Sequence, residues 1–315
     1  MQKLARIALI TALAAAGFGC DQQPAASAGP AGASPAAVAA PAATPDAAVA
    51  MAVKALRDNN IAALFAASLP AGEYAKLKTD WNKDINSEPV TEEDRKDFAE
   101  KMSKLTAPGA EDKMFAEIKP QLDEFDKQSA QQMPMMIAMG QGFAQSAIQQ
   151  NKDLTDAQKQ QVTQLLDATA KWAQNTKFTD PALVKSAIGV ICKTARDLNL
   201  KTVDEARALS YEQGMQKAGI VLGGVKQVLA VYGLNMDKAL DSVKVETVSA
   251  NGDAAKVKIS YTAFETPFST ESDLVRVDGK WYGKDAIEKW KKHSQEIAAA
   301  APATAPAQAP AEGAK

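Results

Sequence analysis

The chain has 315 residues, of which 46% are hydrophobic and 23% charged, and its formal net charge at pH 7 is -2. A nearly neutral chain lacks the basic excess that a nucleic-acid surface needs, so we expect no nucleic-acid partner. The single His excludes a metal site built from several histidines and leaves little room for a Ser/His/Asp relay.

The first residues have the layout of a secretory signal peptide. Lys3 and Arg6 form a short positive region, and an apolar run interrupted only by Thr11 extends from Ile7 to Phe18. This run is too short for a transmembrane span, which needs about 20 apolar residues. We therefore predict that residues 1–19 are a signal peptide.

The sequence Gly17-Phe18-Gly19-Cys20 resembles the lipobox of bacterial lipoproteins, although that family usually has Leu and a small residue where Gly17 and Phe18 stand. The resemblance implies that signal peptidase II cleaves before Cys20. The Cys20 sulfur then carries diacylglycerol, and its new amino group is acylated with palmitate-class chains. Asp21 resembles the signal that retains lipoproteins in the inner membrane of some Gram-negative bacteria. We expect a periplasm-facing protein held on a bacterial membrane, with an ordinary secreted protein as the alternative.

Two segments rich in Ala and Pro flank the rest of the chain. Residues 20–46 and 298–315 contain too few large apolar side chains to order themselves. We predict that the first is a disordered stalk behind the lipidated Cys and the second a disordered tail. Residues 47–240 are then a helical region, and residues 241–297 a small β region with a closing helix.

Apolar residues repeat at helical spacing from Ala47 to about Gly233, which predicts seven to nine helices. Capping boxes are expected where Thr155 precedes Gln158 and Thr202 precedes Glu205. Asp180 is expected to cap a helix that starts at Pro181 and buries Val184, Ile188, Ile191 and Leu198. Pro120 and Pro134 should kink or end helices.

The apolar period then changes to two, which indicates strands over Val243–Thr247 and Val257–Tyr261. A two-residue loop at Asn251-Gly252 would place Val257 opposite Glu246, so we expect a loop of three or five residues. Asp278-Gly279 predicts a tighter hairpin. Pro267 argues against a central strand over Phe264–Ser272. A closing helix should bury Ile287 and Trp290. The expected fold is α+β and mainly α-helical, with a C-terminal antiparallel sheet.

The chain ends on the hairpin Val-Arg-Val-Asp-Gly-Lys-Trp-Tyr, residues 275–282. This ending resembles the last strands of nuclear-transport-factor-two-like or cystatin-like domains, which are common in bacterial lipoproteins. The resemblance covers about 50 residues and implies a curved antiparallel sheet packed on helices.

Four methionines occur within seven residues, at Met133, Met135, Met136 and Met139. Met133, Met136 and Met139 are three apart and would lie near one face of a helix. The side chains could fill a core, because Met adapts to irregular gaps, or line a groove for a lipid or peptide. Thioether sulfur also suits Cu(I), although no His or Cys joins the cluster in sequence.

The most apolar stretch behind the leader extends from Gly214 to Leu234. Lys217 and Lys226 interrupt it, so we predict a buried central helix, with a membrane-inserted hairpin as the alternative. Gly219 and Gly223 would let another helix approach closely. Cys192 lies among apolar residues and is expected to be buried and inert, whereas His293 lies among charged residues and is expected at the surface.

No phosphate loop, zinc-ligand spacing or nucleophile elbow occurs in the chain. We therefore expect no cofactor and no enzymatic activity. The first hypothesis is a partner-binding or scaffold protein that contacts an envelope protein or a peptidoglycan-associated partner. The second is a carrier of a small apolar ligand or lipid, in a cavity between sheet and helices lined by the methionine cluster with Tyr261, Phe264, Leu274 and Trp281.

Overall fold

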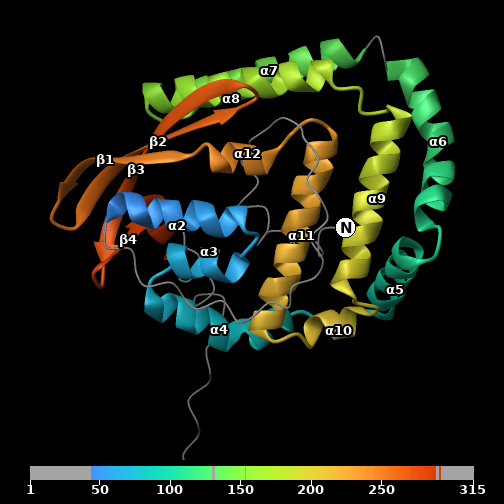
Figure 1. Ribbon diagram of the computed structural model, residues 1–315, viewed down its shortest axis with the longest axis horizontal. Coiled ribbons are helices and arrows are strands. Elements are labelled where there is room, and N and C mark those ends of the chain that lie inside the picture. Colours follow the sequence, from blue (N-terminus) through green and yellow to red (C-terminus); the bar gives the residue numbers. More distant parts are fainter. Residues whose placement is uncertain (1–43, 130–131, 153, 289–290, 292–315) are drawn as a thin grey trace, which may run out of the picture.

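The computed structural model describes residues 44–129, 132–152, 154–288 and 291. The fold is α+β and mainly helical, with a four-stranded antiparallel sheet after the helical body, as predicted (Figure 1). The helices are α2 (Pro45–Arg57), α3 (Ile61–Ser68), α4 (Ala71–Ile85), α5 (Glu92–Thr106), α6 (Ala110–Ser129), α7 (Met133–Gln150), α8 (Asp156–Asn175), α9 (Pro181–Leu198), α10 (Val203–Arg207), α11 (Tyr211–Val231) and α12 (Met236–Asp241). The strands are β1 (Lys244–Asn251), β2 (Ala254–Ala263), β3 (Thr266–Val277) and β4 (Lys280–Gly283).

The helical region contains more helices than predicted. Ten of them, α2 to α11, lie wholly or mostly between residues 47 and 233 of the described chain, against the expected seven to nine. The shortest of them, α10, has five residues, which is less than two helical turns, so it shows little apolar periodicity of its own. Helix α2 also begins at Pro45, slightly before the predicted end of the stalk.

Local start signals predict the helix ends well. Both expected capping boxes are present, at Thr155 before α8 and at Thr202 before α10. The Asp180 side chain accepts hydrogen bonds from two backbone N–H groups of the first turn of α9. Neither proline ends a helix: α6 continues past Pro120, and Pro134 lies in the first turn of α7, where a missing N–H costs nothing.

Helix α11 is the central buried helix that the sequence predicts. It packs on α9 and α3, and its residues Tyr211, Met215 and Leu222 form a core cluster with Ile61 of α3. A second cluster joins Val184, Ile188 and Cys192 of α9 to Ala110 of α6. Ile191 was expected in that cluster but is exposed, because Cys192 and Ala195 take the positions that face the core.

Three glycines of α11 allow its close contacts. We predicted that another helix approaches at Gly219 and Gly223, but the segment that approaches Gly219 is a turn. A Cβ at Gly219 would strike the backbone oxygen of Asn59, in the turn between α2 and α3. It is at Gly224 that another helix approaches, because a Cβ there would strike the side chain of Thr194 in α9. Gly214 similarly leaves room for the Trp81 ring of α4.

A buried lysine links α11 to two other helices. Lys226 is 4% exposed, and its Nζ donates hydrogen bonds to the backbone oxygens of Leu56 at 2.7 Å and Arg57 at 3.0 Å. These carbonyls belong to the last turn of α2, where a cation is favoured by the helix dipole. Nζ also lies 2.7 Å from Asp237 Oδ1 in α12. All three donors of the ammonium group therefore have an acceptor.

The β1–β2 hairpin differs from the prediction. Its loop is the two-residue turn Gly252-Asp253, with Gly252 at φ 60°, and not a loop of three or five residues. A β-bulge at Val248 shifts the register instead, so that Val257 pairs with Thr247 and Ile259 with Val245. Without this extra residue Ile259 would face Glu246, so the bulge keeps both apolar rows on one face.

Strand β3 is longer than predicted, because residues 266–272 pair regularly with β2. Strand β3 tolerates Pro267 for two reasons. Pro267 is the second residue of the strand, and β4 pairs only with residues 274–277, so Pro267 has a neighbouring strand on one side only. The β2–β3 turn places Phe264 and Glu265 at φ 51° and 57°. The predicted Asp278-Gly279 hairpin is confirmed, with both residues at positive φ.

One face of the sheet packs on α2. Val257, Leu274 and Trp281 are buried there against Ala48 and Val49 of that helix. Residues 284–288 begin the predicted closing helix, in which Ile287 is buried. Trp290 and His293, for which we predicted a buried and a surface position, lie outside the described residues.

Candidate binding surface on helix α7

Four large apolar side chains on α7 are exposed to solvent. Met135, Met136, Met139 and Phe143 are 74%, 54%, 58% and 72% exposed. At about 100° of rotation per residue they fall within an arc of about 100° on the helix. We call these four residues the α7 face. Side chains of this size are usually buried, and a contiguous group of them in water is typical of an interaction site.

The α7 face lies opposite the half-buried side of the helix, which consists of Met133, Ile137, Gln141, Ala144, Gln145 and Ile148. Helix α7 packs on α8, and its other contacts in the described chain are slight; Figure 1 shows the two lying side by side at one border of the molecule. Gln141 Nε2 and Gln145 Nε2 donate to Asp167 Oδ1 of α8, at 2.6 and 3.2 Å. These bonds and the half-buried Ile137 and Ile148 lie on the side of α7 opposite the four exposed side chains.

The methionine cluster is divided differently from the prediction. Met133 is half-buried, and Met135 lies on the exposed face with Met136 and Met139. The three-residue spacing does not place Met133 on this face. A helix turns by about 100° per residue, so six residues separate Met133 from Met139 by about 120° around the helix axis. Phe143 was missed in the sequence analysis, although its four-residue spacing from Met139 continues the row Met135, Met139, Phe143.

The other predicted site residues do not meet the methionines. Tyr261 stacks on Phe268 with ring centroids 5.5 Å apart, and the ring centroids of Phe264 and Trp172 of α8 are 6.4 Å apart. Leu274 and Trp281 belong to the core cluster between the sheet and α2. These four side chains therefore pack within the sheet or between the sheet and helices, and none of them lies on the α7 face.

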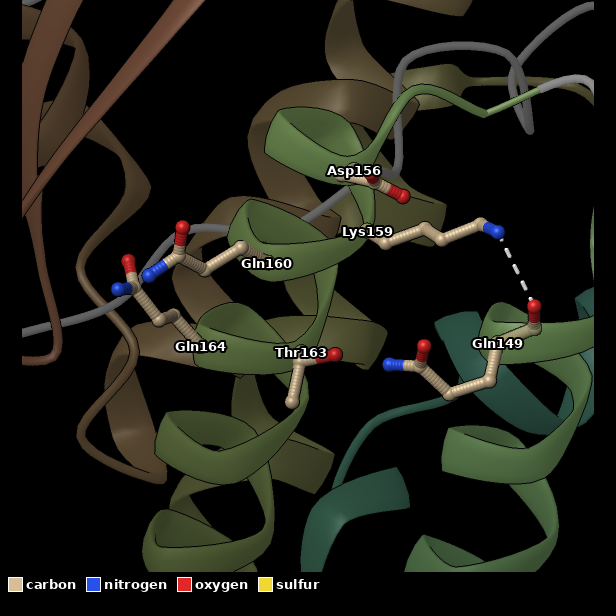
Figure 2. A pocket seen from close by; sticks show the side chains of 6 residues that line it. All are labelled: Gln149, Asp156, Lys159, Gln160, Thr163 and Gln164. Atoms are coloured by element: carbon tan, nitrogen blue, oxygen red, sulfur yellow. Dashed lines mark hydrogen bonds between the residues drawn. The ribbon is translucent and has the colours of Figure 1, made fainter.

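A polar pocket of about 470 Å³ lies between the end of α7 and the start of α8. Figure 2 shows Gln149 and Thr163 approaching each other across it, with the Lys159 Nζ donating to the Gln149 backbone oxygen at 3.1 Å. The Thr163 hydroxyl is buried without a hydrogen-bond partner. The pocket is open, and its lining residues are Gln149, Asp156, Lys159, Gln160, Thr163 and Gln164.

A second cleft, of about 500 Å³, separates α2 from α12 and β1. The charged groups in it are held by partners. Arg57 donates to Asp241 at 2.7 Å, which raises the pKa of Arg57, and hydrogen bonds from Thr44 and Thr247 lower the pKa of Asp46. Groups held this way are poorly suited to proton transfer at neutral pH.

Cys192 is fully buried, as predicted, and its Sγ lies 3.7 Å from the Met114 Sδ. Burial raises the pKa of this thiol, so the thiolate needed for nucleophilic attack is disfavoured. In the described ranges, no three or more His, Cys, Asp or Glu residues gather where they could hold a metal ion. No helix in these ranges combines the length and the apolar character required to cross a membrane.

Comparisons of the chain with models of protein families, with curated proteins and with solved structures found no match.

Proposed function

We propose that this chain is a lipid-anchored bacterial envelope protein that binds an apolar partner through the α7 face and has no catalytic role. The observation that supports the binding role most directly is the exposure of Met135, Met136, Met139 and Phe143 in one row. The lipobox-like segment ending at Cys20 supports the anchoring role.

The shape and chemistry of the α7 face favour a helix of a partner protein. Helix α7 has 18 residues and no charged side chain, and is about 27 Å long at 1.5 Å per residue. Gly140 and Gly142 flank the row of large side chains, and the space where their side chains would be is open. Ridges of Met and Phe beside such notches suit the apolar face of another helix. We propose that an envelope protein, free or associated with peptidoglycan, supplies this helix.

The hydrophobic effect would supply the binding energy. Fully burying one Met or Phe side chain contributes about 1.5–3 kcal/mol. Four such residues can therefore exceed the cost of association without a charged contact, even though ordering the side chains opposes binding. Met also adapts its shape to an irregular partner, because its side chain has three rotatable bonds.

The anchor would keep this surface near the membrane. An acylated Cys20 carries several chains, and each buried methylene contributes about 0.8 kcal/mol, so attachment is stable. Residues 20–43 separate this anchor from the part of the chain that carries the α7 face. Asp21 after the lipidated residue favours retention in the inner membrane.

Lipidation predicts a specific response to one substitution. Cells fed with a radiolabelled or alkyne-tagged palmitate should label the wild-type chain, whereas Cys20→Ser should carry no label because the acceptor sulfur is gone. Globomycin, which inhibits signal peptidase II, should cause the uncleaved, heavier precursor to accumulate. Equal labelling of wild type and Cys20→Ser would show that the chain is not anchored through this residue.

Binding through the α7 face can be tested by photo-crosslinking in the native host. A benzoylphenylalanine at Ser146, which is exposed one turn beyond Phe143, should give a discrete crosslinked protein. The crosslink should fall at least tenfold when Met135, Met139 and Phe143 are all changed to Gln, because the apolar area is lost while the bonds of Gln141 and Gln145 to Asp167 remain.

Val225 provides the matched control position. It is also an exposed apolar residue, but it lies on α11, away from the α7 face. A probe at Val225 should not yield the crosslinked protein. If probes at Ser146 and Val225 give the same products, or if the triple Gln substitution leaves the crosslink unchanged, the α7 face is not the binding surface.

A further inference from the structure

The methionines of this chain differ sharply in their access to solvent. More than half of each Met135, Met136 and Met139 side chain is in water, whereas Met102, Met215 and Met236 are buried in the protein interior. Thioether sulfur is oxidised by small two-electron oxidants that must reach it from solvent. Among the methionines that the structure describes, Met51, Met114 and Met133 are half-buried, and the three exposed ones all lie on one face of α7. Oxidation of these three would change a single surface.

The reaction is a transfer of one oxygen atom. A lone pair of the thioether sulfur attacks one oxygen of a peroxide, the O–O bond breaks, and an S–O bond forms. With hydrogen peroxide the second oxygen leaves as water after a proton moves to it. The sulfur loses two electrons and the peroxide gains them, so methionine and hydrogen peroxide become methionine sulfoxide and water.

We propose that Met135, Met136 and Met139 form a reversible oxidation site for peroxide-class oxidants, and that the sulfoxide form switches off binding by the α7 face. The second half of this proposal rests on the proposed binding function. The first half rests only on the placement of the sulfurs.

Oxidation would change the α7 face without disturbing the fold. Each sulfoxide adds a strongly polar oxygen to a surface that carries no charged residue, so an apolar partner would leave that oxygen without a donor. The hydrogen bonds between α7 and α8 come from the Gln141 and Gln145 side chains, on the side of α7 opposite Met135, Met136 and Met139. The helix pair should therefore stay intact while its outer surface becomes polar.

The site itself is tested with the purified full-length protein, reconstituted in phosphatidylcholine vesicles and treated with hydrogen peroxide. Peptide mapping by mass spectrometry, with fragment ions that separate Met135 from Met136, should show the three α7 methionines oxidising at least tenfold faster than Met102, Met215 and Met236. Methionine sulfoxide reductases for both epimers, with a thiol reductant, should restore them. Equal rates at exposed and buried methionines, or sulfoxides that resist reduction, would overturn the site.

The switch is tested with the crosslinking probe at Ser146. Peroxide treatment should reduce the crosslink at least tenfold, and reduction should restore it. A variant with Met135→Leu, Met136→Leu and Met139→Leu offers no sulfur on the α7 face, so the amount of crosslink that it gives should be the same before and after peroxide. A crosslink that persists in oxidised wild type, or that peroxide removes equally from the Leu variant, would refute the switch. No crosslink before oxidation would instead refute the proposed function, while the mapping still decides whether the oxidation site exists.

Discussion

Replacing Lys226 with Met is expected to lower the free energy of unfolding by about 2–3 kcal/mol, in the range for losing hydrogen bonds from a buried charged group. Met matches the length of the lysine stem but offers no donor. The backbone oxygens of Leu56 and Arg57 then lose the hydrogen bonds from Nζ, and Leu56 O keeps the one from the Asn59 N–H at 3.3 Å. Asp237 keeps only its exposed contact with Arg57, at 3.4 Å.

Urea denaturation measures this effect, and Lys238→Met is the matched control. Lys238 lies on α12 near the same helix junction, but its side chain is exposed. We expect its replacement to change stability by no more than about 0.5 kcal/mol, as is usual for surface substitutions. If the two variants unfold at the same urea concentration, the Lys226 hydrogen bonds do not stabilise the junction of α2, α11 and α12.

Replacing Gly219 with Ala is expected to destabilise the protein by about 2–3 kcal/mol, in the range for forcing extra atoms into a packed interior. The new methyl group would strike the backbone oxygen of Asn59. Asn59 cannot easily yield, because it occupies the turn between α2 and α3 with φ at 56°. Moving this turn would also disturb the carbonyls of α2 that Lys226 binds.

Gly189→Ala separates this steric effect from helix propensity. Gly189 lies inside α9, and a Cβ there would meet open space. Since Ala favours a helix over Gly by about 1 kcal/mol, Gly189→Ala should raise the unfolding midpoint while Gly219→Ala lowers it. Thermal or urea unfolding followed by circular dichroism gives both values. A gain in stability at Gly219 would contradict the close approach of Asn59.

The sequence predicts those parts of the fold that neighbouring residues decide. The capping boxes at Thr155 and Thr202, the start of α9 at Asp180 and the Asp278-Gly279 turn are all confirmed. Each depends on hydrogen bonds or backbone angles within about four residues. The change from helical to alternating spacing likewise locates the sheet.

The candidate site was only half predictable. Four closely spaced methionines single out this segment. The sequence alone does not decide whether they fill a core, line a groove or bind copper. Which residues face outward depends on the packing of α7 on α8, where Gln141 and Gln145 donate to Asp167 more than twenty residues farther along the chain. The placement of Tyr261 and Trp281 in packing clusters depends on α2 and on the sheet pairing.

The helical body, the small antiparallel sheet and the caps and turns between their elements therefore follow from the pattern of amino acids. The bulge at Val248 that sets the sheet register, the close approach of Asn59 to Gly219 and the outward orientation of the α7 methionines are established only in the folded chain. Caps and turns are satisfied by adjacent residues, whereas register, close approach and exposure depend on distant segments.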